Sequence, residues 1–174
     1  MRLRGKKVLM FAGPMVEDIE LLYPLHRLRE EGAEVVVAGL GERSYEGKKG
    51  HRFEVDTDVD RLSARGFDAV VIPGGYAPDH FRRSERLLEI VRETFEEGRP
   101  VAAICHAGWV PVSAGIAKGR QMTSFPSIKD DLMNAGAEWV DREVVADDNL
   151  ITSRKPDDLG AFCLAIIDAL ESQA

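Results

Sequence analysis

The sequence has little cysteine, no long apolar run and no excess of positive charge. Only two of its 174 residues are cysteines, Cys105 and Cys163. That is too few for a disulfide framework and fits a reducing compartment, where thiols stay free. No apolar run approaches the ~18 residues that suggest a membrane span. The net charge of -7 argues against nucleic acid as a main partner, because phosphate binding needs a concentrated positive patch. We therefore expect a cytoplasmic protein that binds neither membrane nor nucleic acid.

The sequence also lacks internal repeats, low-complexity segments and a Pro/Ser-rich linker. Its length is typical of one domain, and it is sufficient for a hydrophobic core without disulfide or metal staples. We predict a single domain over residues 1–174.

Short apolar strands alternate with amphipathic helices along the chain, as the periodicity of the apolar residues indicates. The alternation favours a mostly parallel sheet covered by helices on both faces, with the ligand crevice at the carboxyl ends of the strands. Ser127 and Asp130 stand in capping-box spacing and predict a helix start. The strands are predicted at 8–12, 34–39, 69–73 and 101–104, the helices at 17–31, 84–97, 106–114, 127–134 and 156–171, and short strands and hairpins at 41–60 and 138–153.

The segment VAAICHAGW ends a buried strand on a thiol, Cys105, rather than on a turn residue. If a tight strand-to-helix elbow follows, the sulfur projects over the end of the sheet. The N–H groups and positive dipole end of the next helix then face it. Such an environment lowers the pKa of a thiol and favours the reactive thiolate. The alternative is a core cysteine, because free cysteine is among the most buried residue types. Cys163, inside AFCLAII, fits that description better.

Other residues near these strand ends have a structural and a functional interpretation. His106 is either a general base or only a backbone N–H donor. The Gly74–Gly75 pair is either a plain turn or an oxyanion-hole partner for the N–H of His106. Glu17 and Asp18 stand at the start of a helix, where acids are common because they suit the dipole. No histidine has metal-ligand spacing from another histidine or a cysteine, so no metal site is predicted.

Taken together, these segments resemble the PfpI family of intracellular peptidase-like proteins, within the class I glutamine amidotransferase-like superfamily. The resemblance covers nearly the whole chain in order, and it is specific as a set. The segments that carry it are EDIELLYPLHRLREEG, FDAVVIPGGYAPD, EEGRPVAAICHAGW, SAGIAKGRQMTSFPSIKDDLMNAGAEWVDREVV and ITSRKPDDLGAF.

The resemblance implies a flavodoxin-like three-layer α/β/α sandwich with Cys105 as the nucleophile at the elbow. Glu17 would match the family's active-site glutamate, which reaches the sulfur and holds a proton because two adjacent negative charges are costly. Gly75 and His106 would supply the oxyanion N–H pair. Asp79 would match the acid that peptidase members borrow from a neighbouring subunit, where a Glu is usual.

Departures from the family pattern bear on activity, and one of them is the His-Ala-Gly-Trp stretch after Cys105, where His-Gly-Pro or His-Ala-Pro is common. Asp79 is one methylene shorter than Glu, and Phe125 stands where relatives often carry Tyr. They weaken the case for a peptidase more than the case for thiol chemistry on small carbonyl compounds.

The resemblance leads to three functional hypotheses. The first is a cytosolic cysteine-dependent hydrolase or lyase of the deglycase or glyoxalase type. It would act on glycated protein or nucleotide amino groups or on 2-oxoaldehydes such as methylglyoxal, in stress defence and with no added cofactor. The second is an intracellular cysteine peptidase that cleaves unfolded protein with Cys105 and His106. The third is a non-enzymatic redox sensor or chaperone. The resemblance also implies a homodimer or hexamer, whose interface would bury the region of Tyr23 or the loop that carries Asp79.

Overall fold

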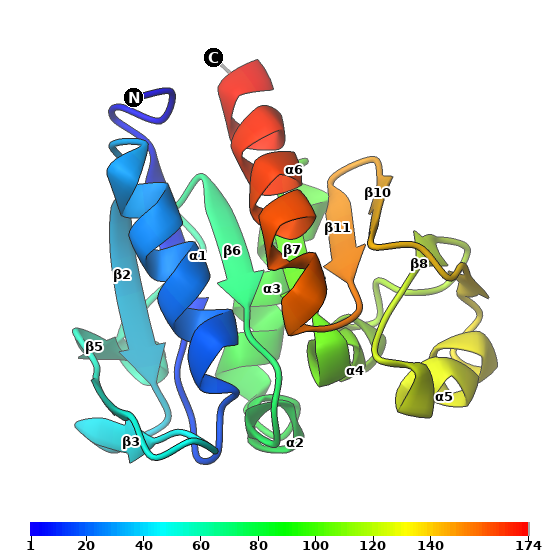
Figure 1. Cartoon of the computed structure of the whole chain (residues 1–174), viewed down its shortest axis with the longest axis horizontal. Helices are drawn as coiled ribbons and strands as arrows, with labels where there is room; N and C mark the ends of the chain where they lie inside the picture. The colour runs from blue at the N-terminus through cyan, green and yellow to red at the C-terminus, as the bar shows by residue number, and fades with distance from the viewer. Residues whose placement is uncertain (174) are drawn as a thin grey trace.

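The computed structural model describes residues 1–173 as one mixed α/β unit (Figure 1). The large strands are β1 (Lys7–Phe11), β2 (Glu34–Gly39), β6 (Ala69–Ile72), β7 (Val101–Ile104), β10 (Val144–Asp147) and β11 (Leu150–Ser153). Five short strands accompany them: β3 (Ser44–Glu46), β4 (Arg52–Glu54), β5 (Thr57–Asp58), β8 (Gln121–Met122) and β9 (Glu138–Trp139). The helices are α1 (Asp18–Glu30), α2 (Ala77–Phe81), α3 (Glu85–Glu96), α4 (Trp109–Ala114), α5 (Lys129–Asn134) and α6 (Leu159–Ser172).

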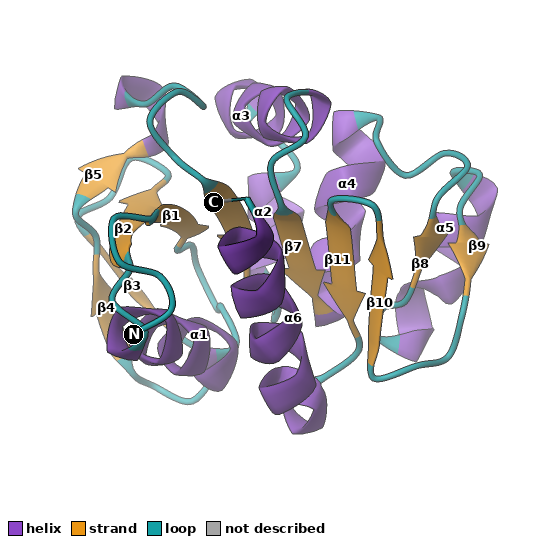
Figure 2. Ribbon diagram, turned by 90° about the horizontal axis from the view of Figure 1, so that it is seen from above, coloured by secondary structure: helices purple, strands orange, loops and turns teal. Residues whose placement is uncertain are grey.

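The main sheet has the order β10-β11-β7-β6-β1-β2-β5, and only the pairing of β10 with β11 is antiparallel. Helices α1 and α6 cover one face, while α3 and α4 cover the other (Figure 2). The predicted three-layer sandwich with a mostly parallel sheet is therefore confirmed. Within residues 1–173, no helix is long and apolar enough to cross a membrane.

The central strands are the most deeply buried part of the chain. Every residue of β6 and β7 is buried, as a parallel sheet with two covered faces requires. Leu21 and Leu28 of α1 contribute to the core on one face, and Leu87 and Ile90 of α3 contribute on the other. This packing fixes the position of the strand ends from which the candidate site is built.

The loops after β1, β6 and β7 meet at the carboxyl edge of the sheet. The loop after β6 is bonded to the loop after β1: Val16 and Gly75 form an isolated β-bridge, and Tyr76 N–H donates to Met15 O at 2.9 Å. Gly75 has φ +80°, a left-handed conformation that favours glycine. A Cβ there would lie 2.3 Å from Glu17 N and 2.6 Å from Met15 O, so the two loops can approach this closely only at a glycine.

We expect Gly75→Ala to destabilise the protein more than Gly98→Ala does. Both residues have positive φ, +80° and +74°, but a Cβ at Gly98 meets nothing within 4 Å. The control substitution therefore isolates the backbone strain, about 1 kcal/mol, whereas Gly75→Ala adds a clash with backbone and should cost roughly 3 kcal/mol or more. Urea unfolding of both variants at one pH measures the difference. Equal losses of unfolding free energy in the two variants would mean that the loops after β1 and β6 can separate without cost.

Candidate active site

Cys105 stands at the elbow that the sequence predicts. It follows β7 directly and begins a 3-10 turn, Cys105–Gly108, that leads into α4. Its φ is +62°, which a residue with a side chain rarely adopts, and such outliers concentrate at functional sites. The backbone N–H groups of Gly75 and His106 act on the sulfur and favour its anionic form. The two N–H groups that the sequence singles out thus lie near the thiol.

This thiol lies in a more buried environment than the sequence predicts. Cys105 is only 8% exposed. Burial, together with the negative charge of Glu20, raises its pKa to about 12, and this outweighs the two N–H donors. Burial therefore favours the protonated thiol over the thiolate.

The glutamate beside the sulfur is Glu20, which corrects the prediction of Glu17. Glu20 is fully buried, its Oε1 accepts the Gly74 N–H at 2.9 Å, and its carboxyl interacts with the Cys105 thiol. A Cβ on Gly74 would lie 2.5 Å from Glu20 Oε1 and 2.9 Å from Cys105 Cβ, which shows how tightly the two side chains converge. One helical turn separates Glu17 from Glu20, and the second of them faces inward.

Burial raises the pKa of Glu20 to about 8, so this carboxyl holds a proton at neutral pH. Within residues 1–173, its Oε2 accepts no hydrogen bond. A proton on Oε2 suits that environment, because it removes the charge from a carboxyl oxygen that has no donor to stabilise it. The property that the sequence analysis assigned to Glu17, a protonated carboxyl beside the thiol, is thus found at Glu20.

Glu17 binds Lys48 instead. The two side chains form an ion pair of 3.0 Å, and Lys48 Nζ also lies 5.0 Å from the centre of the Tyr76 ring. The positive charge of Lys48 acts on both Cys105 and Glu20, where it favours the anionic form. Sequence reasoning missed Lys48, because it lies in a loop between two short strands with no motif around it.

Asp18 holds the loop that carries Lys48. The Asp18 carboxylate is buried and accepts the backbone N–H groups of Lys49 at 2.8 Å and His51 at 2.9 Å. A Cβ on Gly47 would lie 2.5 Å from that carboxylate. From the sequence, Asp18 is expected only to suit the helix dipole. In the structure it also holds the loop that places the Lys48 ammonium at the site.

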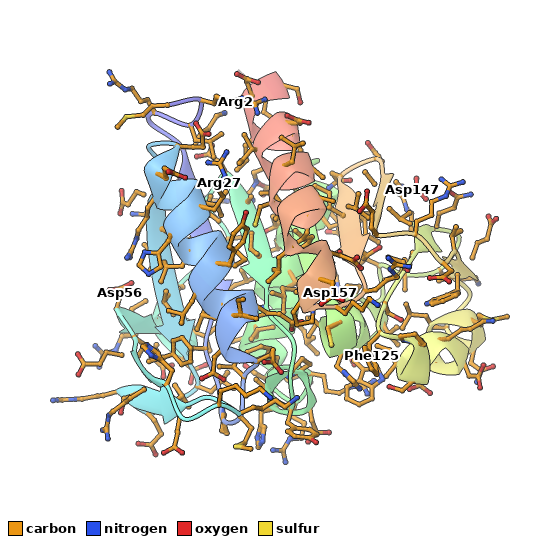
Figure 3. All side chains as sticks on the ribbon, in the orientation of Figure 1. Arg2, Arg27, Asp56, Phe125, Asp147 and Asp157 are labelled. Atoms are coloured by element: carbon orange, nitrogen blue, oxygen red, sulfur yellow. The ribbon has the colours of Figure 1, made fainter. Side chains whose placement is uncertain are left out.

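His106 faces the thiol with one ring nitrogen and Ser127 with the other. Its Nδ1 lies 3.3 Å from Cys105 Sγ, and its Nε2 lies 3.0 Å from Ser127 Oγ. The ring stacks on Phe125, with centroids 5.1 Å apart, and meets the edge of Trp109 at 5.3 Å. Figure 3 shows Phe125 on the side of the molecule where α4 and α5 lie. Burial, then the charge of Lys48, lowers the pKa of His106, so at neutral pH the ring is uncharged and able to accept a proton.

The predicted acid Asp79 lies in α2. Within residues 1–173, its carboxylate forms no side-chain hydrogen bond or ion pair, so a role for Asp79 requires a second copy of the chain. Cys163 is buried in α6, as the sequence indicates for a core residue. No group of three or more His, Cys, Asp or Glu within the same described range is arranged to hold a metal ion.

The fold and the site define a class of protein: an α/β/α sandwich with a cysteine in left-handed backbone conformation at a central strand end, beside a buried protonated glutamate. The DJ-1/PfpI family model matches residues 6–169, and the chain belongs to this family. The chain is 47% identical to a deglycase of Pyrococcus horikoshii over 165 residues. The matched region covers 95% of this chain and 99% of that protein.

Two further relatives extend the comparison. The protein/nucleic acid deglycase 2 of Escherichia coli is 39% identical over 161 residues, which cover 91% of this chain and 94% of that one. The crystal structure of Drosophila melanogaster DJ-1beta superposes with a TM-score of 0.90 at 34% identity and covers 95% of this chain and 90% of the other. The resemblance noted from the sequence segments is therefore confirmed, as is the flavodoxin-like fold.

We expect Glu20→Gln to change how the stability depends on pH. A carboxyl whose pKa is raised by folding, here from 4.5 to about 8, stabilises the folded state below pH 4.5 and loses this contribution as the pH rises to 8. For one group the loss is at most about 5 kcal/mol. The glutamine cannot ionise, so its unfolding free energy should fall less than that of the wild type between pH 4.5 and 8.

Urea unfolding at several pH values measures this difference. The exposed Glu54→Gln variant is a matched control and should keep the wild-type decline. If the unfolding free energies of Glu20→Gln and the wild type fall in parallel between pH 4.5 and 8, the carboxyl ionises normally and does not hold a proton at neutral pH.

Proposed function

We propose that the protein is a cysteine-dependent deglycase or glyoxalase that acts on 2-oxoaldehydes such as methylglyoxal, or on their adducts with amino groups. The observation that carries the proposal is the buried sulfur of Cys105, which has two N–H donors and a protonated carboxyl beside it. This arrangement suits addition to a carbonyl followed by proton movement between neighbouring carbons. The names of the Pyrococcus and Escherichia relatives support the same reaction class.

The first step is addition of the thiol to the aldehyde carbon. A sulfur–carbon bond forms, the thiol proton goes to His106 Nδ1, and it then moves to the aldehyde oxygen to give a hemithioacetal. The N–H groups of Gly75 and His106 are placed to stabilise the developing oxyanion. Because the thiol pKa is raised, proton transfer to the neutral imidazole accompanies attack rather than preceding it.

The second step moves hydrogen from the first carbon to the second. Glu20 gives its proton to the ketone oxygen, and the resulting carboxylate removes the proton from the first carbon to form an enediol. Glu20 then delivers that proton to the second carbon, and the hydroxyl on the first carbon passes its proton to the resulting Glu20 carboxylate, which yields a thioester and restores the protonated acid. Water cleaves the thioester to lactate and restores the thiol. The reaction needs no external oxidant or reductant, because one carbon is oxidised as its neighbour is reduced.

A peptidase is the second candidate, and the 3.3 Å contact between Cys105 Sγ and His106 Nδ1 favours it. The same sulfur, base and N–H pair suit acyl transfer from a peptide bond. The role of the carboxylate that Asp79 would supply depends on a neighbouring subunit.

We also propose that the protein assembles as a homodimer or larger oligomer. Exposed apolar side chains on α1 support an interface there: Ile19 is 48% exposed and Tyr23 is 40% exposed, and both line a surface hollow of about 520 Å³.

The decisive experiment compares wild type with Cys105→Ser in two assays, methylglyoxal consumption and casein hydrolysis. We expect the wild type to produce lactate from methylglyoxal and the serine variant to lose this activity by at least about a hundredfold, because a serine hydroxyl is a far weaker nucleophile than a cysteine. Near-ultraviolet circular dichroism checks that the variant remains folded. Turnover that survives in Cys105→Ser would exclude this sulfur as the nucleophile.

Asp79→Asn separates the two candidates. If the protein is a peptidase with a shared acid, this substitution should reduce casein hydrolysis by about tenfold or more and leave lactate formation unaffected, because the hemithioacetal route does not use Asp79. If the wild type does not hydrolyse casein, the peptidase hypothesis is rejected.

A further inference from the structure

Ser127 is the one serine whose hydroxyl meets a ring nitrogen of a candidate catalytic residue within residues 1–173. Its Oγ lies 3.0 Å from His106 Nε2, although 21 positions separate the two residues. The sequence predicts Ser127 as a helix cap. In the structure Ser127 lies inside the 3-10 turn Pro126–Ile128, and α5 begins after Ile128 without a side-chain cap. The hydroxyl is directed to the imidazole instead.

The segment that carries Ser127 is attached to the elbow. Phe125 N–H donates to Cys105 O at 3.3 Å, and Ile128 is buried. The indole of Trp109, in α4, donates to the Asp131 carboxylate of α5 at 2.8 Å. These contacts hold Ser127 and His106 at a fixed separation, so their hydrogen bond does not depend on a freely moving loop.

We propose that Ser127 is a positioning residue that keeps His106 oriented with Nδ1 toward the Cys105 thiol and with Nε2 protonated. When Ser127 Oγ accepts the Nε2 hydrogen, the Nδ1 lone pair faces the sulfur at 3.3 Å. The thiol proton then passes to Nδ1, and the imidazolium keeps its hydrogen bond to Ser127. One chain thus contains nucleophile, base and orienting group. This assignment rests on the proposed use of Cys105 as nucleophile.

The other charged groups near His106 do not offer the same contact. Lys48 acts on the ring through its charge, which opposes protonation. Arg82 lies over the Trp109 ring at 5.3 Å, and Asp131 binds the indole of that residue. Phe125 and Trp109 pack against the imidazole but offer no hydrogen-bond acceptor at Nε2. Among the described residues, Ser127 is therefore the group that distinguishes Nε2 from Nδ1.

The test measures alkylation of Cys105 by iodoacetamide between pH 6 and pH 10, with peptide mass mapping to separate Cys105 from Cys163. This readout depends on the thiol and its base, and it requires no substrate. We expect Ser127→Ala to slow alkylation at pH 7 by about three- to tenfold and to move the pH profile upward, because loss of one hydrogen bond changes an equilibrium by roughly that factor. Ser127→Thr, which keeps a hydroxyl, should restore the wild-type profile. The remote Ser172→Ala control should match wild type.

Three results would overturn the assignment: a wild-type rate and pH profile in Ser127→Ala, an equal loss in Ser127→Thr and Ser127→Ala, or a loss in Asp79→Asn that Ser127→Ala does not show. The last result would mean that the Asp79 carboxylate of a second copy, rather than Ser127, accepts the hydrogen of His106 Nε2. If Ser127→Ala slows alkylation but the wild type does not turn over methylglyoxal, the positioning role of Ser127 is supported. Only the proposed reaction is then rejected.

Discussion

The left-handed backbone of Cys105 is the constraint on which the site depends. With φ at +62°, the residue turns the chain sharply between β7 and the following 3-10 turn and directs its sulfur toward the loops from β1 and β6. A side chain in this conformation is unfavourable on its own. The buried strand on one side and the packed Ala107 and Gly108 on the other keep it in place. The N–H groups of Gly75 and His106 favour the anionic form of this sulfur.

The burial that holds this turn also determines the proton chemistry. Sulfur and carboxyl are both removed from water, and burial favours the neutral form of each. One positive charge, that of Lys48, acts on both, and it is held in place by Glu17 from the start of α1. The resting site is therefore a neutral thiol beside a neutral acid, next to a neutral imidazole. In the proposed reaction, protons would move within the site, and a charged state would have to be stabilised by the substrate.

The sequence is sufficient to predict the scaffold and the elbow at Cys105, since both depend on local patterns. The strands at 34–39 and 101–104 have the predicted bounds, because an apolar run with clear polar ends marks a buried strand. The choice between Glu17 and Glu20 is not local. The two residues stand one helical turn apart at the start of α1, and only the contact of Glu20 with Gly74, which is 54 positions away, decides which carboxyl is buried. Lys48 was missed for the same reason: Asp18 places its loop, and nothing in the loop itself indicates a site.

Ser127 shows how a correct local signal leads to a wrong assignment when tertiary contacts compete for the same group. A serine three residues before an acid is a good helix start, and a helix does follow at Lys129–Asn134. The Ser127 hydroxyl contacts the imidazole of His106 rather than a backbone N–H of the helix, and the imidazole lies within reach because α4 and α5 are joined through Trp109 and Asp131. The helix loses one cap, which typically costs about 1 kcal/mol. The candidate base gains an orientation that water at the same position would not enforce, because water has no fixed attachment to the chain.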